Sequence, residues 1–124
     1  MSRAAITLST LSLCLAIFGE GALAKSRVLL PPAQYDRPAV NVTVIELPAS
    51  QVHDKCVALG APAYIRVPGD STIEGCSVAL DRLIVVPTPD SVGWSKYACI
   101  WRHEVAHING WAHDHPGGRH SREC

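Results

Sequence analysis

The sequence predicts a small α+β domain in which a mixed β-sheet packs on one long helix. Two observations support this class. Short β-branched segments and helical segments follow one another in the order β-α-β-β-α, and the last helical segment has a regular apolar stripe. The chain has 124 residues, which is enough to bury one modest core. We therefore expect a single domain behind an N-terminal targeting segment.

The first 24 residues have the features of a secretory signal peptide. Arg3 gives a positive start, residues 4–18 are almost wholly apolar or small, and Ala22-Leu23-Ala24 is a small-x-small cleavage site. The apolar run is too short to span a bilayer comfortably. A lipid anchor on Cys14 is the alternative, but the residue before it is larger than a lipidation site prefers. We expect residues 25–124 to be released as a secreted or periplasmic protein.

The charge balance excludes some classes of partner. The sequence has 11 basic and 11 acidic residues, and the signal peptide contains one charge of each sign, Arg3 and Glu20. The mature chain is therefore neutral, which indicates neither a nucleic acid nor an anionic membrane as a partner. After signal cleavage we expect no membrane association.

Four of the 5 cysteines lie in the mature chain. An even number in a small exported domain favours two disulfides over free buried thiols. Three pairings are possible, and we favour Cys56–Cys76 with Cys99–Cys124.

The first half of the mature chain contains one strand and one helix. Residues 25–38 are rich in proline and charge and predict an extended lead-in. Residues 40–47 alternate and are β-branched, which predicts a strand. Ser50 is a suitable N-cap for a short helix over residues 51–59, and Gly60 is a suitable stop.

The middle of the chain predicts two further strand regions. Residues 63–67 form a second short strand, which ends at Pro68-Gly69-Asp70. Residues 76–86 contain a third strand, clearest at residues 83–86, and Asp81-Arg82 can form a hairpin-like break within it.

The last helix is predicted to begin at Asp90 or Ser91 and to end at Asn109-Gly110. At ~100° per residue, its apolar stripe lies opposite His103 and His107. We therefore expect the stripe to pack on the sheet and the two imidazoles to face outward. The stripe consists of Trp94, Ala98, Trp101, Val105 and Ile108.

His103 and His107 lie one helical turn apart, with their rings on the same side of the predicted helix. Both can reach one ion at the ~2.0–2.1 Å that zinc prefers. Glu104 follows about 100° around the helix, beside the metal rather than on it. It can take a proton from a metal-bound water and pass it to a leaving amine, so Glu104 is the predicted catalytic base.

The third ligand has three candidates. Gly110 allows the chain to turn back sharply, and His113 follows at a suitable spacing. Asp114 and His115 come directly after it, and either can replace it as a ligand. Asp114 can instead accept a hydrogen bond from a ligand imidazole. Three protein ligands leave a fourth position for water, which is typical of a catalytic zinc site.

Other residues near the motif have structural interpretations. Cys99 and His107 are about 12 Å apart along a straight helix, so they cannot share one ion, and a disulfide suits Cys99 better. Trp111 is predicted to pack against the turn, with a substrate-pocket wall as the alternative. His53 and His120 are predicted to be solvated.

The run from His103 to His113, extended by Asp114, resembles the long zinc-binding motif of the metzincin metallopeptidases. This resemblance implies a minimal zincin-like domain with Zn²⁺ as cofactor, His103, His107 and His113 as ligands, and Glu104 as general base. The chain departs from the metzincin pattern in one respect. Metzincins have a methionine-containing turn downstream of the third ligand, and the only methionine here is Met1.

The chain is also similar to small exported bacterial proteins with H-E-x-x-H-x-x-G-W followed by Asp-His. The run from His103 to Trp111 and the pair Asp114-His115 match that pattern. This second resemblance favours Asp114 or His115 as the third ligand.

The sequence thus predicts an exported zinc-dependent hydrolase, most specifically a metallopeptidase that cleaves a peptide or protein substrate. The alternative is a periplasmic binding or assembly protein with a structural metal site and no catalysis. Metal carriage by the histidine-rich segment that begins at His113 is a third interpretation.

Overall fold

A computed structural model describes residues 28–61, 63–66 and 72–124 of the chain. The predicted signal peptide and its cleavage site lie outside these residues. Four strands and three helices follow one another in the order β1 (Thr43–Leu47), α1 (Ala49–Ala58), β2 (Ala63–Arg66), β3 (Ile73–Val78), β4 (Leu83–Pro87), α2 (Pro89–Val92) and α3 (Trp94–Ile108). In the described part of the chain, no helix is long and apolar enough to cross a membrane.

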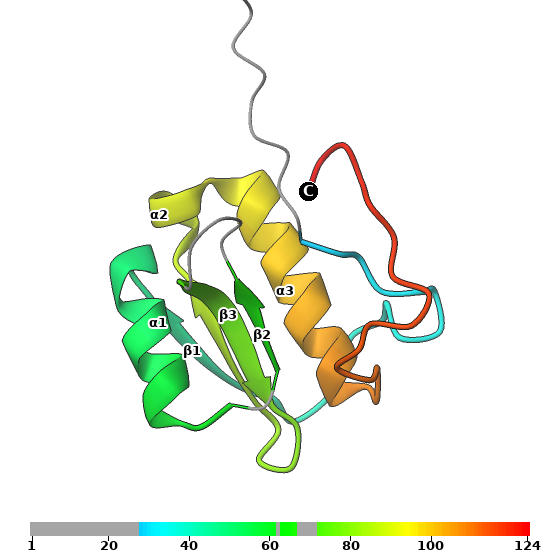
Figure 1. Cartoon of the computed structure of the whole chain (residues 1–124), viewed down its shortest axis with the longest axis horizontal. Helices are drawn as coiled ribbons and strands as arrows, with labels where there is room; N and C mark the ends of the chain where they lie inside the picture. The colour runs from blue at the N-terminus through cyan, green and yellow to red at the C-terminus, as the bar shows by residue number, and fades with distance from the viewer. Residues whose placement is uncertain (1–27, 62, 67–71) are drawn as a thin grey trace, which may run out of the picture.

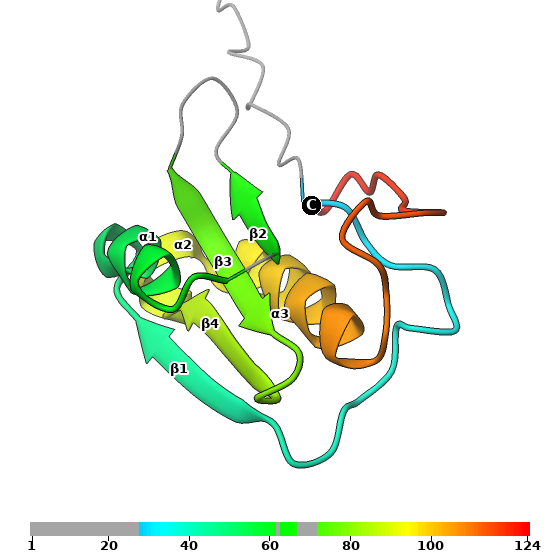
Figure 2. The same cartoon turned by 60° about the horizontal axis from the view of Figure 1, so that its bottom comes forward.

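The four strands form one sheet behind α3 in the view of Figure 1, and Figure 2 shows their order, β1-β4-β3-β2. Strand β1 runs parallel to β4, and β3 is antiparallel to both β4 and β2. The predicted third strand is therefore two strands, β3 and β4. The chain turns between them at Asp81-Arg82, where the break was predicted, and Arg82 has a φ of 49°.

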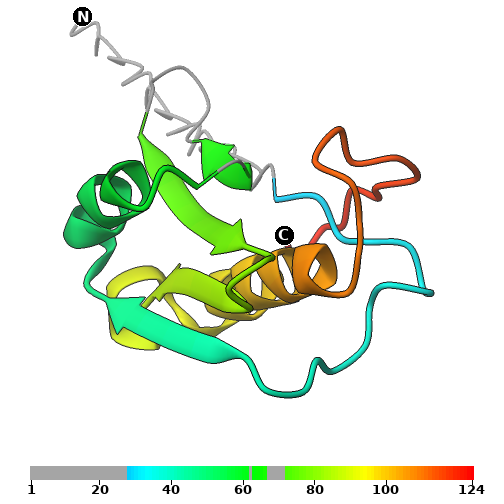
Figure 3. The ribbon, with the colours of Figure 1, turned by 90° about the horizontal axis from the view of Figure 1, so that it is seen from below.

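The sheet is covered on both faces, by α1 on one side and by α3 on the other (Figure 3). Alternation along β4 produces this arrangement, because successive side chains of a strand point to opposite faces. Ile84 and Val86 belong to the apolar cluster that contains the core residues of α3. Val85 belongs to the cluster that contains Val52 and Cys56 of α1. The prediction of an α+β fold with a mixed sheet packed on the motif helix is confirmed.

Both predicted disulfides are present. Cys56–Cys76 joins α1 to β3, and Cys99–Cys124 joins α3 to the end of the described chain. The first lies within the α1 side of the core, and the second lies on the α3 side.

Two predictions about helix ends are wrong. Ser50 does not cap α1, which starts at Ala49 after Pro48 and has no side-chain cap. The last helix does not run unbroken from Asp90, because Gly93 has a φ of 87° and separates α2 from α3. A positive φ is incompatible with a right-handed helix, so α3 starts afresh at Trp94.

The predicted apolar stripe is correct over its C-terminal half. Val105 and Ile108 are buried in the core and Trp101 packs against it, but Trp94 is 72% exposed. The side of α3 that meets β3 carries Ile100 and Glu104 instead. The aromatic rings at the start of α3 pack on one another: Trp94 contacts Tyr97, and Tyr97 contacts Trp101.

Gly75 allows α3 to pack closely on β3. A Cβ atom at this position would lie 2.8 Å from Ile100 Cγ2 and 3.3 Å from Glu104 Oε1. We expect Gly75→Ala to lower the free energy of unfolding by about 1–3 kcal/mol, because an added methyl overpacks a filled core. Urea unfolding measures this effect. Ser77→Ala, which adds no atoms to the same strand, is the control, and equal stability of the two variants would contradict this packing.

Candidate metal centre

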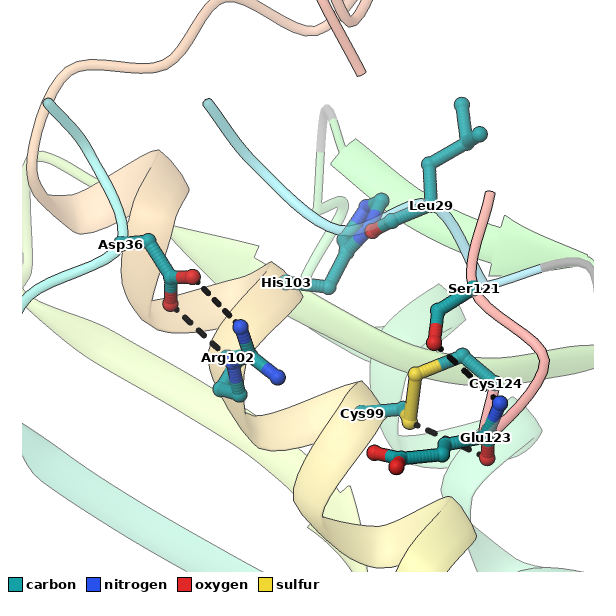
Figure 4. The surroundings of a disulfide bond; sticks show 8 residues. All are labelled: Leu29, Asp36, Cys99, Arg102, His103, Ser121, Glu123 and Cys124. Atoms are coloured by element: carbon teal, nitrogen blue, oxygen red, sulfur yellow. Dashed lines mark hydrogen bonds and ion pairs between the residues drawn. A yellow bond between two sulfur atoms is a disulfide. The ribbon is translucent and has the colours of Figure 1, made fainter. Parts of the chain in front are cut away.

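His103 and His107 project from α3 into a buried site. Their exposed fractions are only 3% and 2%, so they do not face solvent as the sequence suggested. Trp111 lies against both rings, at centroid distances of 5.2 Å. The lead-in covers the site from another direction, because Leu29 contacts His103 (Figure 4).

A salt bridge holds the lead-in on α3. Arg102 donates two hydrogen bonds to the Asp36 carboxylate, at 3.1 and 2.5 Å (Figure 4). The hydrogen bond from Arg102 lowers the pKa of Asp36, against a smaller opposing effect of burial. The carboxylate is therefore ionised at neutral pH and keeps its ion pair with the residue next to His103.

Backbone carbonyls fix the tautomers of both helical imidazoles. The Nδ1 atom of His103 lies 2.7 Å from the Leu29 carbonyl oxygen, and that of His107 lies 2.7 Å from the Trp111 carbonyl oxygen. A carbonyl oxygen only accepts hydrogen bonds, so each Nδ1 must carry the proton. Each Nε2 therefore has a free lone pair, which is the form that binds a metal ion.

Three Nε2 atoms converge at this site. The distance from His103 to His107 is 3.2 Å, and that from His115 to His107 is 3.3 Å. The Nε2 atoms of His103 and His107 cannot hydrogen-bond to each other in these tautomers, and a cation between them would satisfy both lone pairs. Tetrahedral ligands at the ~2.0–2.1 Å typical of zinc are about 3.3–3.4 Å apart. Among the described residues, these three histidines are the one group of His, Cys, Asp and Glu side chains that could hold an ion.

The predicted candidates for the third ligand occupy different places. His115, one of the predicted alternatives, lies in the group of three. His113, the first choice, is exposed, and its ring packs edge-on against His107 at a centroid distance of 5.1 Å. Asp114 is also exposed, and neither residue belongs to the group. The Asp-His pair after Trp111 was the sequence signal for His115.

Trp111 is a packing residue, as predicted. It is 1% exposed, and its indole stacks on the His107 ring with an angle of 15° between the planes. Its Nε1 donates a hydrogen bond of 2.9 Å to the Pro116 carbonyl oxygen. Trp111 therefore joins the end of α3 to the turn that carries His115.

Glu104 lies on the sheet side of the same helix and has an exposed fraction of 0%. Neither of its carboxylate oxygens has a hydrogen-bond partner among the described residues. Burial raises the pKa of Glu104 to about 8, and the Ser77 hydroxyl opposes this rise to a smaller extent. The two side chains are not hydrogen-bonded to each other. The Ser77 hydroxyl, like the Glu104 carboxylate, has no partner in the described part of the chain. A buried carboxylate of this kind needs a nearby cation or a proton.

Burial has the opposite effect on the histidines. It lowers the pKa of His103 to about 3 and that of His107 to about 4, and repulsion between the neighbouring imidazoles adds to the effect. Burial also lowers the pKa of His115. All three rings are therefore neutral at physiological pH, ready to bind a metal ion.

The raised pKa of Glu104 predicts a pH-dependent stability of the metal-free protein. Its folded value of about 8 lies above its ordinary value of 4.5, so the contribution of the Glu104 proton to stability is fully present below pH 4.5 and is lost as the pH rises through 8. We expect metal-free Glu104→Gln to gain stability relative to wild type between these values. The lowered pKa values of the histidines reduce the stability as the pH falls below 6.5, but they do so equally in wild type and in the variant. Urea unfolding in chelator from pH 5 to 9 measures the difference, and a pH-independent difference would contradict the prediction.

The two remaining histidines lie away from this group. His53 is not solvated as predicted: it is half-buried, and its Nδ1 accepts a hydrogen bond of 3.0 Å from the Ile73 backbone N–H. His120 is exposed.

No protein-family model matches this chain, and comparisons with curated proteins and with solved structures find no match either. The three histidines and Glu104 are therefore the features of this chain that bear on its function.

Proposed function

We propose that this chain is an exported zinc-dependent hydrolase, most specifically a metallopeptidase that acts on peptides or proteins. The convergence of three Nε2 atoms, with separations of 3.2 and 3.3 Å, is the observation that carries the proposal. The unpaired buried carboxylate of Glu104, on the same helix as two of these histidines, supports a catalytic role for the site. Two disulfides are compatible with export.

Each residue of the site has a role in this proposal. Zinc, when bound, lowers the pKa of a coordinated water and polarises a substrate carbonyl. His103, His107 and His115 would hold the ion, and the carbonyls of Leu29 and Trp111 would keep both helical imidazoles in the binding tautomer. Glu104 would accept a proton from the attacking water and donate it to the leaving amine.

Metal analysis combined with a peptidase assay tests this proposal. We expect one zinc per chain and cleavage of casein or a peptide library, with loss of activity in chelator and recovery on adding zinc. Glu104→Gln should keep its zinc and lose at least about 100-fold in turnover, because general acid–base catalysis typically contributes 10²–10⁴-fold. Full activity of Glu104→Gln would show that the mechanism is wrong.

A second candidate is a non-catalytic periplasmic binding or assembly protein with a structural metal site. The near-complete burial of His103, His107 and Glu104 favours it, because a catalytic site needs access for a substrate. This candidate predicts stoichiometric zinc without peptidase activity in wild type. The assay described above therefore separates the two candidates.

A further inference from the structure

The third histidine of the metal group does not lie on a helix or a strand. His115 belongs to the irregular chain that follows α3, which we call the C-terminal segment (residues 111–124). Its backbone has a φ of 58°, which is a left-handed conformation that residues other than glycine rarely adopt. Such a conformation persists only where the surrounding structure enforces it. His115 therefore depends on whatever holds the C-terminal segment in place.

The lead-in provides one attachment for this segment. Leu30 and Arg119 form an antiparallel β-bridge, with N–H···O distances of 2.9 and 2.8 Å. The Arg119 side chain also donates a hydrogen bond of 3.0 Å to the Pro31 carbonyl oxygen. The two segments lie side by side next to the end of α3 (Figure 2). This attachment is noncovalent and consists of one isolated bridge and the hydrogen bonds of the Arg119 side chain.

A disulfide provides a covalent attachment. Cys124 is bonded to Cys99, which lies on α3 one turn before His103 (Figure 4). Both cysteines are buried in the α3 side of the core. The C-terminal segment is therefore held covalently to the same helix that carries the other two histidines.

We propose that the Cys99–Cys124 disulfide is a positioning element of the metal centre, because it holds His115 beside His103 and His107. The site then binds zinc tightly only in the oxidised protein. A dithiol that reduces the disulfide breaks the S–S bond, leaves two thiols and becomes a disulfide itself, and the segment keeps only noncovalent contacts, at the lead-in and at Trp111. This inference rests on the metal centre of the proposed function and concerns its regulation.

The other disulfide is a matched control. Cys56 and Cys76 are 20 residues apart in sequence, against 25 for Cys99 and Cys124. The two closed loops therefore restrict the unfolded chain to a similar extent. Cys56–Cys76 lies on the α1 side of the sheet, opposite the histidines. Its loss should destabilise the fold without releasing His115.

The experiment compares Cys99→Ser/Cys124→Ser with Cys56→Ser/Cys76→Ser. Competition with a chromophoric chelator gives the zinc Kd, and the visible absorption of bound Co²⁺ reports the coordination number. We expect the first variant to bind zinc at least about 10-fold more weakly, as is typical when a group that orients a ligand is lost, and to show an altered Co²⁺ spectrum. The second variant should match wild type in both readouts. Wild-type binding by both variants, or equal weakening of both, would overturn the proposal.

Two further measurements keep the result decisive. If Cys99→Ser/Cys124→Ser does not fold, as judged by circular dichroism, a phosphine added to Cys56→Ser/Cys76→Ser reduces Cys99–Cys124 in a prefolded protein. Zinc affinity should then fall by the same factor, and an unchanged affinity overturns the inference. If wild-type protein binds zinc but cleaves no peptide, the proposed peptidase activity is wrong and this inference is unaffected. Wild-type protein that binds no zinc overturns the metal centre itself.

Discussion

Replacing His115 by alanine should weaken zinc binding by at least about 100-fold, whereas replacing His113 should leave the affinity near that of wild type. The loss should exceed the 10–100-fold that follows when a residue supporting a ligand is removed, because the ligand itself is lost. His115 lies in the group of three, and His113 only packs edge-on against His107.

Chelator competition on the two variants measures this difference directly. Asp114→Ala is a matched control, because Asp114 is exposed and lies between the two histidines in sequence. We expect this variant to bind zinc like wild type. If His113→Ala lost the metal while His115→Ala kept it, the ligand set would be that of the long metzincin motif instead.

Among the single substitutions considered, Trp111→Ala should lower the stability most. We expect a loss of about 3–5 kcal/mol in the free energy of unfolding, as is usual when a large buried aromatic residue is truncated. The indole is buried against His103 and His107. It also lies close to Gly118, where an added Cβ would be 3.2 Å from Trp111 Cζ2. Removing it leaves a cavity at the junction of α3 and the C-terminal segment, so zinc affinity should fall as well.

Trp111→Phe separates packing from hydrogen bonding. This variant keeps a ring against His107 but loses the Nε1 hydrogen bond to the Pro116 carbonyl. A hydrogen bond of this kind contributes about 0.5–1.5 kcal/mol, so the loss should be clearly smaller than for alanine. Urea unfolding of both variants gives the comparison. A loss below about 1 kcal/mol for Trp111→Ala would contradict the packing role.

Local sequence patterns predicted most of the secondary structure but not how α3 is rotated against the sheet. The strands, the hairpin break at Asp81-Arg82 and the disulfide pairing agree with the structure. The stripe that starts at Trp94 gave the angular position of apolar residues around the helix axis. It could not show that Gly75 on β3 leaves room for Ile100 and Glu104. That fit depends on a neighbour distant in sequence.

The site shows the same division between local and distant effects. A spacing of four residues on a helix is enough to place His103 beside His107, and the structure has these rings at a centroid distance of 4.9 Å. The path of the chain after Gly110 depends instead on Trp111, on the lead-in and on the bond to Cys99. No local pattern describes these contacts, so the sequence left His113, Asp114 and His115 as alternatives.

The hydrogen bond from His103 to the Leu29 carbonyl has a consequence for the order of folding. It joins residues 74 positions apart in sequence, so a long loop must close before it forms. The bridge between Leu30 and Arg119 closes a still longer loop. Contacts of such high sequence separation form slowly, which places the assembly of this site after the β3–β4 hairpin and α3. A metal ion that binds only the finished site would stabilise the latest contacts to form and thereby the whole native state.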